Sequence, residues 1–181
     1  TAFPKYKTVS GVLLSSVPEI RHTSPYMLIE TMDAAFSDLV NNKINLSEIG
    51  AIKIDAMQHC TVYTNNSFKT RIGSLDPDKT LIDQLESCIS RPTSPIWEDR
   101  STDTEVKILT DLLISYNGIN NITGNKVELR FPAVQIMKWA KESPAEYNNT
   151  SNIFLLSAFM TSLLSGTVAP VDTGDGWGTN M

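Results

Sequence analysis

The chain has 181 residues, of which 41% are hydrophobic and 19% charged, and its net charge is −5. This composition excludes intrinsic disorder and is typical of one globular domain with a sizeable hydrophobic core. The negative charge and the lack of a Lys/Arg cluster argue against binding to nucleic acid or to an anionic membrane surface.

Strands and helices alternate in the first part of the chain, which is the pattern of an α/β fold. Ser24 and Pro25 mark a helix start, because serine caps free amide groups and proline suits the first helical position. Ile52 and Ile54 alternate with charged residues, which predicts a strand. The predicted elements up to residue 64 are a strand over residues 8–16, a helix over 25–41, a turn over 46–48, and strands over 49–56 and 61–64.

The second part of the chain is predicted to be mostly helical, with polar loops between the helices. Asp103 and Glu105 favour a helix start, because acidic side chains in a first turn interact well with the helix dipole. The predicted elements beyond residue 64 are a loop over 65–78, helices over 81–89 and 102–115, a turn over 117–125, helices over 133–142 and 152–164, and a glycine-rich loop over 169–181.

Two cysteines, Cys60 and Cys88, lie far apart in the sequence and form no metal-binding or redox motif. No apolar run is long enough to span a bilayer, and no signal peptide opens the chain. We therefore expect a cytoplasmic domain with no membrane partner, in which both cysteines are free, buried thiols.

Two loops carry side chains suited to holding a polar ligand. His59 follows the predicted strand over residues 49–56, and ligands of α/β sheets collect at the carboxyl ends of strands. Arg130 has a planar fork of donors suited to hydroxyls, carboxylates or phosphates. The alternatives are a histidine that only packs and an arginine in an ordinary surface salt bridge.

Two further loops combine acidic, amide and aromatic side chains. In the loop over residues 95–99, Trp97 is expected to pack and Asp99 to cap a turn. In the loop over residues 169–181, Asp172, Asp175 and Asn180 supply groups that hydrogen-bond hydroxyls. The sequence contains no P-loop, dinucleotide-binding glycine motif, zinc-ligand spacing or nucleophile elbow. It therefore predicts binding of a small polyhydroxylated molecule, with no catalytic, cofactor-binding or metal-binding residue.

Taken in chain order, these motifs resemble the FGGY carbohydrate kinases, and within them the xylulose kinases. Each motif alone is weak, but their order along nearly the whole chain is specific. The matching segments are Phe3-Pro4-Lys5-Tyr6-Lys7-Thr8, Thr23-Ser24-Pro25, Gln58-His59 with Val62-Tyr63, Ser94-Pro95-Ile96-Trp97 with Asp99, Thr123-Gly124, Arg130-Phe131 with Gln135-Ile136, and the residues Pro170, Asp172, Asp175, Gly176, Gly178 and Asn180.

The resemblance implies a ribonuclease H-like (actin-like ATPase) α/β fold, incomplete at both ends. Residues 1–181 would form a single domain, part of the N-terminal sugar-binding domain, without the C-terminal ATP-binding domain that partners it in cis. The parent protein would transfer a phosphoryl group from ATP, with Mg²⁺, to a ketose, D-xylulose being the expected substrate. The family's catalytic aspartate motif and its phosphate loops do not occur in these residues, so we expect the isolated chain to be inactive.

For the site, the resemblance implies that His59 and Arg130 hold sugar hydroxyls, with Gln58 beside them. It implies that Asp99, Asp172, Asp175 and Asn180 order the loops near the cleft, rather than act as catalytic bases. The chain departs from the family pattern at Cys60, Arg100 and Trp177, which affects the identity of the sugar.

Two alternatives stay open. One is a non-catalytic sugar-binding module or decayed kinase relative, and the other is a structural α/β domain without a ligand. The second would be favoured if His59 and Arg130 lay on opposite faces of the domain.

Overall fold

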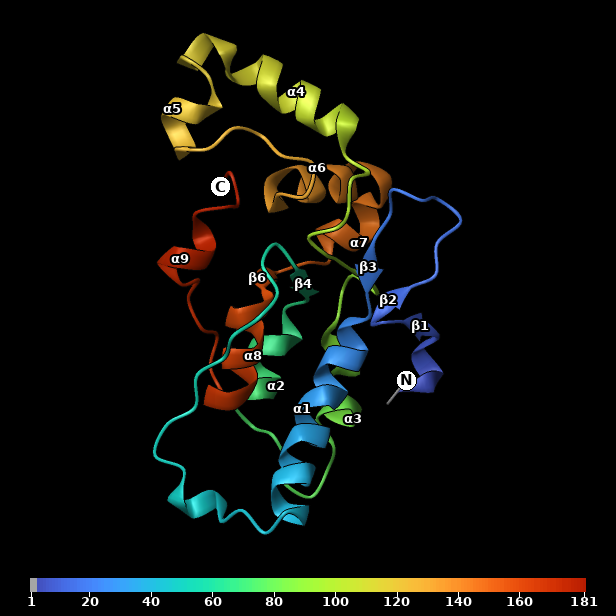
Figure 1. Cartoon of the computed structure of the whole chain (residues 1–181), viewed down its shortest axis with the longest axis vertical. Helices are drawn as coiled ribbons and strands as arrows, with labels where there is room; N and C mark the ends of the chain where they lie inside the picture. The colour runs from blue at the N-terminus through green and yellow to red at the C-terminus, as the bar shows by residue number, and fades with distance from the viewer. Residues whose placement is uncertain (1–2) are drawn as a thin grey trace.

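The structure is a computed structural model that describes residues 3–181. Short antiparallel strand pairs connect its helices, and the molecule is elongated, with α4 and α5 at one end and α1 reaching the other (Figure 1). The strands are β1 (Thr8–Val9), β2 (Val12–Leu13), β3 (His22–Thr23), β4 (Thr61–Thr64), β5 (Ser94–Pro95) and β6 (Asn152–Leu155). The helices are α1 (Pro25–Asn41), α2 (Ser67–Ile72), α3 (Leu81–Leu85), α4 (Asp103–Leu113), α5 (Ile119–Thr123), α6 (Pro132–Glu142), α7 (Pro144–Asn148), α8 (Leu156–Ser165) and α9 (Thr173–Gly176), with 3₁₀ turns at Pro4–Tyr6, Leu46–Glu48, Glu86–Cys88 and Ile114–Tyr116.

The hydrophobic core surrounds the pair formed by β4 and β6. Thr61 lies opposite Leu155 in this antiparallel ladder, and every residue of β4 is buried. Phe68 from α2, Phe154 from β6 and Phe159 from α8 meet beside it, with ring centroids 5.4–5.9 Å apart. These aromatic contacts join the sheet to two helices that are far apart in the sequence.

Locally encoded helices form where the sequence predicts them. The Ser24 hydroxyl accepts a hydrogen bond from the Met27 amide at 3.3 Å, so it caps α1 as expected. The predicted helices over residues 102–115 and 133–142 appear as α4, with a 3₁₀ extension, and as α6. The predicted strand over residues 61–64 is β4, and the predicted helix over residues 81–89 appears as α3 followed by a 3₁₀ turn.

The predicted strand over residues 49–56 is wrong. This segment has no regular structure and runs along one edge of the molecule towards β4 (Figure 1). Ile52 is 53% exposed, although the alternating pattern predicted one buried face. Within residues 3–181 no strand pairs with this segment, and a strand is stable only when a neighbour completes its backbone hydrogen bonds.

Five further predictions need correction, one of them the predicted loop over residues 169–181, which contains α9. The predicted strand over residues 8–16 is a hairpin, because Ser10 and Gly11 adopt φ angles of 51° and 83° and turn the chain between β1 and β2. The predicted helix over residues 152–164 begins as strand β6, because pairing with β4 overrides its helical pattern. The predicted loop over residues 65–78 contains α2, and the predicted turn over residues 117–125 contains α5.

Cys60 and Cys88 are free and buried, as predicted. Burial raises the pKa of the Cys60 thiol to about 12, so this side chain stays protonated and unreactive at neutral pH. None of the helices within residues 3–181 combines the length and the apolar character that crossing a membrane requires.

Replacing Phe159 by alanine should lower the free energy of unfolding by about 3–5 kcal/mol, because the substitution would leave a cavity in the aromatic cluster. Tyr116→Ala is the matched control, since Tyr116 is 67% exposed and should change stability by less than about 0.5 kcal/mol. Urea denaturation followed by far-UV circular dichroism measures both variants. Equal losses for the two would contradict this location of the core.

Candidate functional site

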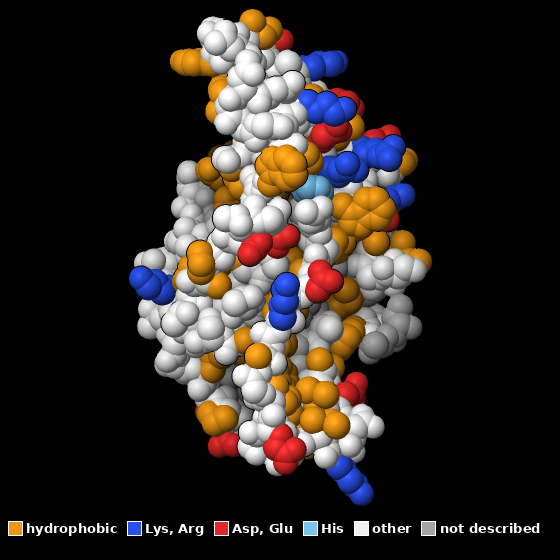
Figure 2. Space-filling model, turned by 60° about the vertical axis from the view of Figure 1, so that its left-hand side comes forward, with side chains coloured by type: hydrophobic (Ala, Val, Ile, Leu, Met, Phe, Trp, Pro, Cys, Tyr) orange, Lys and Arg blue, Asp and Glu red, His pale blue; other side chains and the backbone are white. Residues whose placement is uncertain are grey.

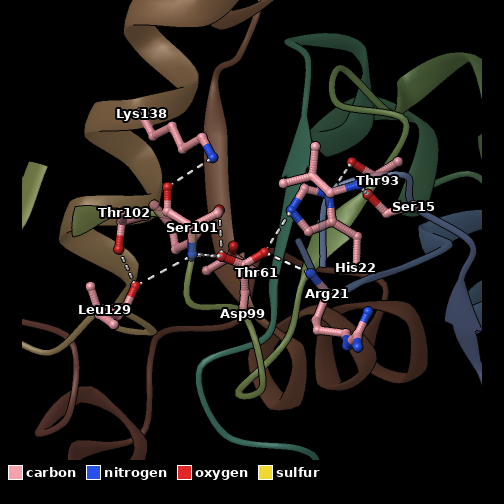
Figure 3. A network of polar contacts seen from close by, with 12 residues as sticks. Ser15, Arg21, His22, Thr61, Thr93, Asp99, Ser101, Thr102, Leu129 and Lys138 are labelled. Atoms are coloured by element: carbon pink, nitrogen blue, oxygen red, sulfur yellow. Dashed lines mark hydrogen bonds and ion pairs between the residues drawn. The ribbon is translucent and has the colours of Figure 1, made fainter. Parts of the chain in front are cut away.

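A buried carboxylate, Asp99, lies at the centre of the polar network that joins the candidate loops (Figure 3). One oxygen, Oδ2, accepts the Arg21 amide at 2.9 Å and lies 3.3 Å from His22 Nε2. The other, Oδ1, accepts the Ser101 amide at 3.0 Å, the Ser101 hydroxyl at 2.7 Å and Gln135 Nε2 at 2.6 Å. Both oxygens are therefore satisfied by donors from separate segments of the chain.

These donors determine the charge of Asp99. Burial by itself would raise the pKa of Asp99, but the hydrogen bonds from His22, Ser101 and the Arg21 amide outweigh it. The pKa of Asp99 is consequently held well below its usual range. Asp99 is therefore ionised at neutral pH.

The network continues from Asp99 to the loop that carries Arg130. Gln135, which donates to Asp99, also donates to the Leu129 carbonyl at 3.3 Å. The Thr102 hydroxyl donates to the same carbonyl oxygen, and Lys138 Nζ donates to the Ser101 carbonyl at 3.0 Å (Figure 3). Leu129 precedes Arg130 directly, so Asp99 and its partners fix the backbone from which the Arg130 side chain extends.

His59 and Arg130 lie on the same side of the molecule. The His59 ring lies 4.9 Å from the ring of Phe131, the residue after Arg130, measured between centroids. Half-burial lowers the pKa of His59, and the nearby charge of Arg130 lowers it further. His59 is therefore a neutral imidazole at neutral pH, with one donor and one acceptor nitrogen. Gln58, beside it, is exposed.

The ring of His59 is tightly enclosed by the C-terminal loop. A Cβ placed on Gly178 would lie 2.7 Å from His59 Cε1, so only glycine fits at this position without displacing the ring. His59 itself has a φ of 61°, an uncommon backbone conformation for a residue with a side chain. The local backbone and Gly178 together determine where the imidazole points.

The C-terminal loop is ordered by contacts with residues 123–133. Asn180 Nδ2 donates to the Thr123 hydroxyl at 3.0 Å, and the Thr179 carbonyl accepts the Ala133 amide at 3.1 Å. Asp172 caps α9 by accepting the Gly174 amide at 2.8 Å. The Asp175 carboxylate accepts the Ser157 hydroxyl, which connects α9 to α8.

Two open cavities flank this region. A cavity of about 460 Å³ is lined by Pro18, Glu19, Arg21, Trp97, Glu98, Arg100 and Arg130. A cavity of about 390 Å³ is lined by residues 52–56, Ser157, Ala158, Thr161, Pro170, Asp172 and Asp175. Arg130 lines the first cavity and Asp175 the second, and the charges of both residues act on the pKa of His59. Figure 2 shows a face on which a histidine lies among exposed hydrophobic side chains, with Lys and Arg side chains adjoining.

No sequence pattern indicates that His22 and Gln135, two members of the network, are partners of Asp99. His22 Nδ1 lies 2.8 Å from the Thr93 hydroxyl, so the imidazole bridges the loop before β5 and the Asp99 carboxylate. Gln135 appeared only as part of the motif Gln135-Ile136. His22 lies 77 residues before Asp99 in the sequence, and Gln135 lies 36 residues after it. At such separations no local sequence pattern indicates that these residues are in contact.

Replacing Asp99 by asparagine should lower the free energy of unfolding at neutral pH by about 3 kcal/mol, because a neutral amide cannot accept all of the donors that face the carboxylate. The folded-state pKa of Asp99 lies below its unfolded value. Its stabilising contribution is therefore complete above the unfolded pKa and is lost as the pH falls through the folded one.

Urea denaturation at a series of pH values below about pH 5 tests this assignment. Wild type should lose stability more steeply with acid than Asp99→Asn, while Asp111→Asn, on the exposed surface of α4, should behave like wild type. Parallel acid profiles for Asp99→Asn and wild type would refute the assignment.

No protein-family model matches the chain. It is 34% identical over 176 residues to the xylulose kinase of Schizosaccharomyces pombe, an alignment that covers 97% of this chain and 31% of that protein. It is 36% identical over 155 residues to a probable D-xylulose kinase A of Arthroderma otae, covering 86% of this chain and 26% of that protein. Xylulose kinase 2 of Arabidopsis thaliana is 32% identical over 179 residues, or 98% of this chain and 32% of that protein.

Solved structures show the same relationship at the level of the fold. The xylulose kinase of Rhodospirillum rubrum superposes with a TM-score of 0.62 and 15% identity, over 82% of this chain and 26% of that one. A gluconate kinase from Lactobacillus acidophilus superposes with a TM-score of 0.67 and 14% identity, over 92% of this chain and 29% of that one. The α/β fold of these actin-like sugar kinases is thus confirmed for this chain, which spans 26–32% of the length of the relatives described above. By sequence, the chain is similar to part of several proteins named xylulose kinase, and the solved structures that share its fold are sugar kinases.

Proposed function

We propose that these 181 residues supply part of the sugar-binding side of an ATP-dependent ketose kinase, with D-xylulose as the acceptor. The observation that carries the proposal is the closeness of His59 and Arg130, whose charge acts on the His59 ring while Phe131 packs against it. Both side chains are hydrogen-bonding groups suited to hydroxyls. The relatives named xylulose kinase give the chemical class of the ligand.

In this proposal His59 and Arg130 position the sugar and take no part in bond making. The neutral imidazole offers one donor and one acceptor, and the guanidinium offers a rigid fork of donors. Gln58, exposed beside His59, contributes an amide at the rim. Holding the accepting hydroxyl in place is much of what phosphoryl transfer asks of a protein, because the transition state needs alignment and charge stabilisation.

The acidic residues have a supporting role in the same proposal. Asp99 orders the loop of Arg130 through Gln135 and Leu129. Asp172, Asp175 and Asn180 order the C-terminal loop that encloses His59. Each of the four has partners within the chain that account for its position, and we assign none of them as a catalytic base.

We place the ATP and Mg²⁺ site of the parent kinase in other residues, belonging to a C-terminal kinase domain in cis. Within residues 3–181 no group of three or more His, Cys, Asp or Glu side chains is arranged to hold a metal ion. The sequence also has no glycine loop of the kind that cradles phosphates. In this assignment residues 1–181 act as a single domain. A phosphoryl donor held by the parent would supply the transferred group.

A non-catalytic sugar-binding module is the second candidate function. It is favoured by the same site, because His59 and Arg130 would bind a sugar whether or not a phosphoryl donor is present. The parent reading frame separates the two: a catalytic aspartate and phosphate loops elsewhere in it identify a kinase, and their absence identifies a binding protein.

D-Xylulose should bind the chain, and His59→Ala and Arg130→Ala should each weaken that binding about tenfold, because each removes hydrogen bonds to the sugar worth about 1.4 kcal/mol. Isothermal titration calorimetry measures the three affinities. Lys69→Ala, at the exposed surface of α2, is the control and should bind like wild type. Equal binding by all of these proteins would defeat the site assignment.

The purified chain should show no xylulose-dependent hydrolysis of ATP and form no xylulose phosphate, because it lacks the phosphate loops and the catalytic aspartate of the family. A coupled assay for ADP, with the full-length parent as positive control, measures this. Phosphorylated sugar above the background of a protein-free reaction would overturn the assignment of the ATP site to other residues.

A further inference from the structure

The cavity of about 460 Å³ brings three arginines together from separate segments. Arg21 precedes β3, Arg100 follows β5 by a short turn, and Arg130 precedes α6. Glu19 and Glu98 line the same cavity, so its formal charge is +1. Arginine at this density is unusual in a chain whose overall charge is −5.

The guanidinium groups of these arginines are available to a ligand. Within residues 3–181, none of the three forms an ion pair with a carboxylate, although Glu19 and Glu98 lie on the same cavity wall. The buried acid Asp99 binds the backbone amide of Arg21, and Figure 3 shows the guanidinium of Arg21 pointing away from it.

The backbone beneath the arginines is held in place. The Arg21 carbonyl accepts the Ile96 amide at 3.0 Å, and the Arg21 amide donates to Asp99 at 2.9 Å. The Arg100 amide donates to the Glu19 carbonyl at 2.9 Å, so the antiparallel contact between the two segments continues beyond β3 and β5 at the end that carries Arg21 and Arg100. A site whose backbone is already ordered loses less entropy when a ligand binds.

We propose that this cavity binds a small anion, of the class of a phosphate monoester of a polyol. Planar guanidinium forks recognise phosphate oxygens in pairs, and three of them around one cavity exceed what a neutral sugar needs. The volume lies in the range of small-molecule sites and leaves room for a carbon skeleton beside the phosphate. Trp97, 49% exposed on the same wall, offers an apolar face to that skeleton.

This site goes beyond the proposed function, because its main ligands, Arg21 and Arg100, are not among the residues assigned to the neutral sugar. It does not require phosphoryl transfer to occur. A chain that binds no neutral D-xylulose could still bind the anion, and the reverse also holds. Failure of one proposal is thereby distinguishable from failure of the other.

Calorimetric titration of the chain with xylulose 5-phosphate, inorganic phosphate and neutral D-xylulose tests the site. We expect Arg21→Ala and Arg100→Ala each to weaken binding of the phosphorylated sugar about tenfold, and added salt to weaken it further. Glu98→Gln should tighten it, because it removes a negative charge from the wall. Arg71→Ala, an exposed arginine of α2 that does not line the cavity, is the matched control and should leave the affinity unchanged.

The ligands distinguish the source of the anion. Tighter binding of xylulose 5-phosphate than of inorganic phosphate identifies a phosphorylated sugar, whereas equal affinities identify free phosphate, and both support an anion site. The proposal is overturned if neither anion binds, or if Arg71→Ala weakens binding as much as Arg21→Ala and Arg100→Ala do. Circular dichroism of each variant, expected to match wild type because these side chains lie at the surface, verifies that the fold is intact.

Discussion

The buried carboxylate of Asp99 is the interaction on which the candidate site depends. Placing a charged group away from water is unfavourable unless its oxygens find donors, and an unsatisfied one destabilises the fold by several kcal/mol. Here the donors come from the segment before β3, from the start of α4 and from α6. Satisfying one carboxylate therefore fixes three separate segments relative to one another, and these segments carry Arg21, Arg100 and Arg130.

A second buried charge, Arg91, contacts a residue of β4. The Arg91 Cζ lies 4.9 Å from the ring centroid of Tyr63 and 4.6 Å from that of Trp139, and the guanidinium donates to the Tyr63 hydroxyl at 3.0 Å. Burial lowers the pKa of Arg91, while Tyr63 and the negative charge of Asp99 counteract that effect. The charges of Arg91 and Asp99 thus attract each other without forming a direct ion pair.

The parts of this structure that the sequence predicts are those encoded locally. The cap at Ser24 and the proline after it specify the start of α1 whatever the rest of the chain does. The segment over residues 49–56 has an equally clear strand pattern, yet no strand pairs with it within residues 3–181, because pairing is a property of two segments. The opposite error occurs at residues 152–155. Their pattern predicts a helix, but they form strand β6 because they pair with β4.

The candidate site is likewise predictable from the sequence only where its features are encoded locally. His59 and Arg130 were linked by resemblance to a family, because no spacing rule connects residues so far apart. Their partners His22 and Gln135 reach Asp99 only through tertiary packing, which neither composition nor periodicity encodes. Gly178 is a similar case, since its lack of a side chain matters only because His59 lies against it.

Arg130 connects the two proposed ligands physically. Its charge lowers the pKa of His59, and its side chain also lines the arginine-rich cavity. An anion bound in that cavity would offset part of the positive charge that His59 experiences, so the pKa of His59 would rise towards its ordinary value. Linkage makes this effect reciprocal: protonation of His59 would favour the anion by the same free energy with which the anion favours the proton. Because a protonated imidazole can no longer accept a hydrogen bond from a sugar hydroxyl, occupancy of the cavity and recognition of the neutral sugar would be coupled through a single guanidinium.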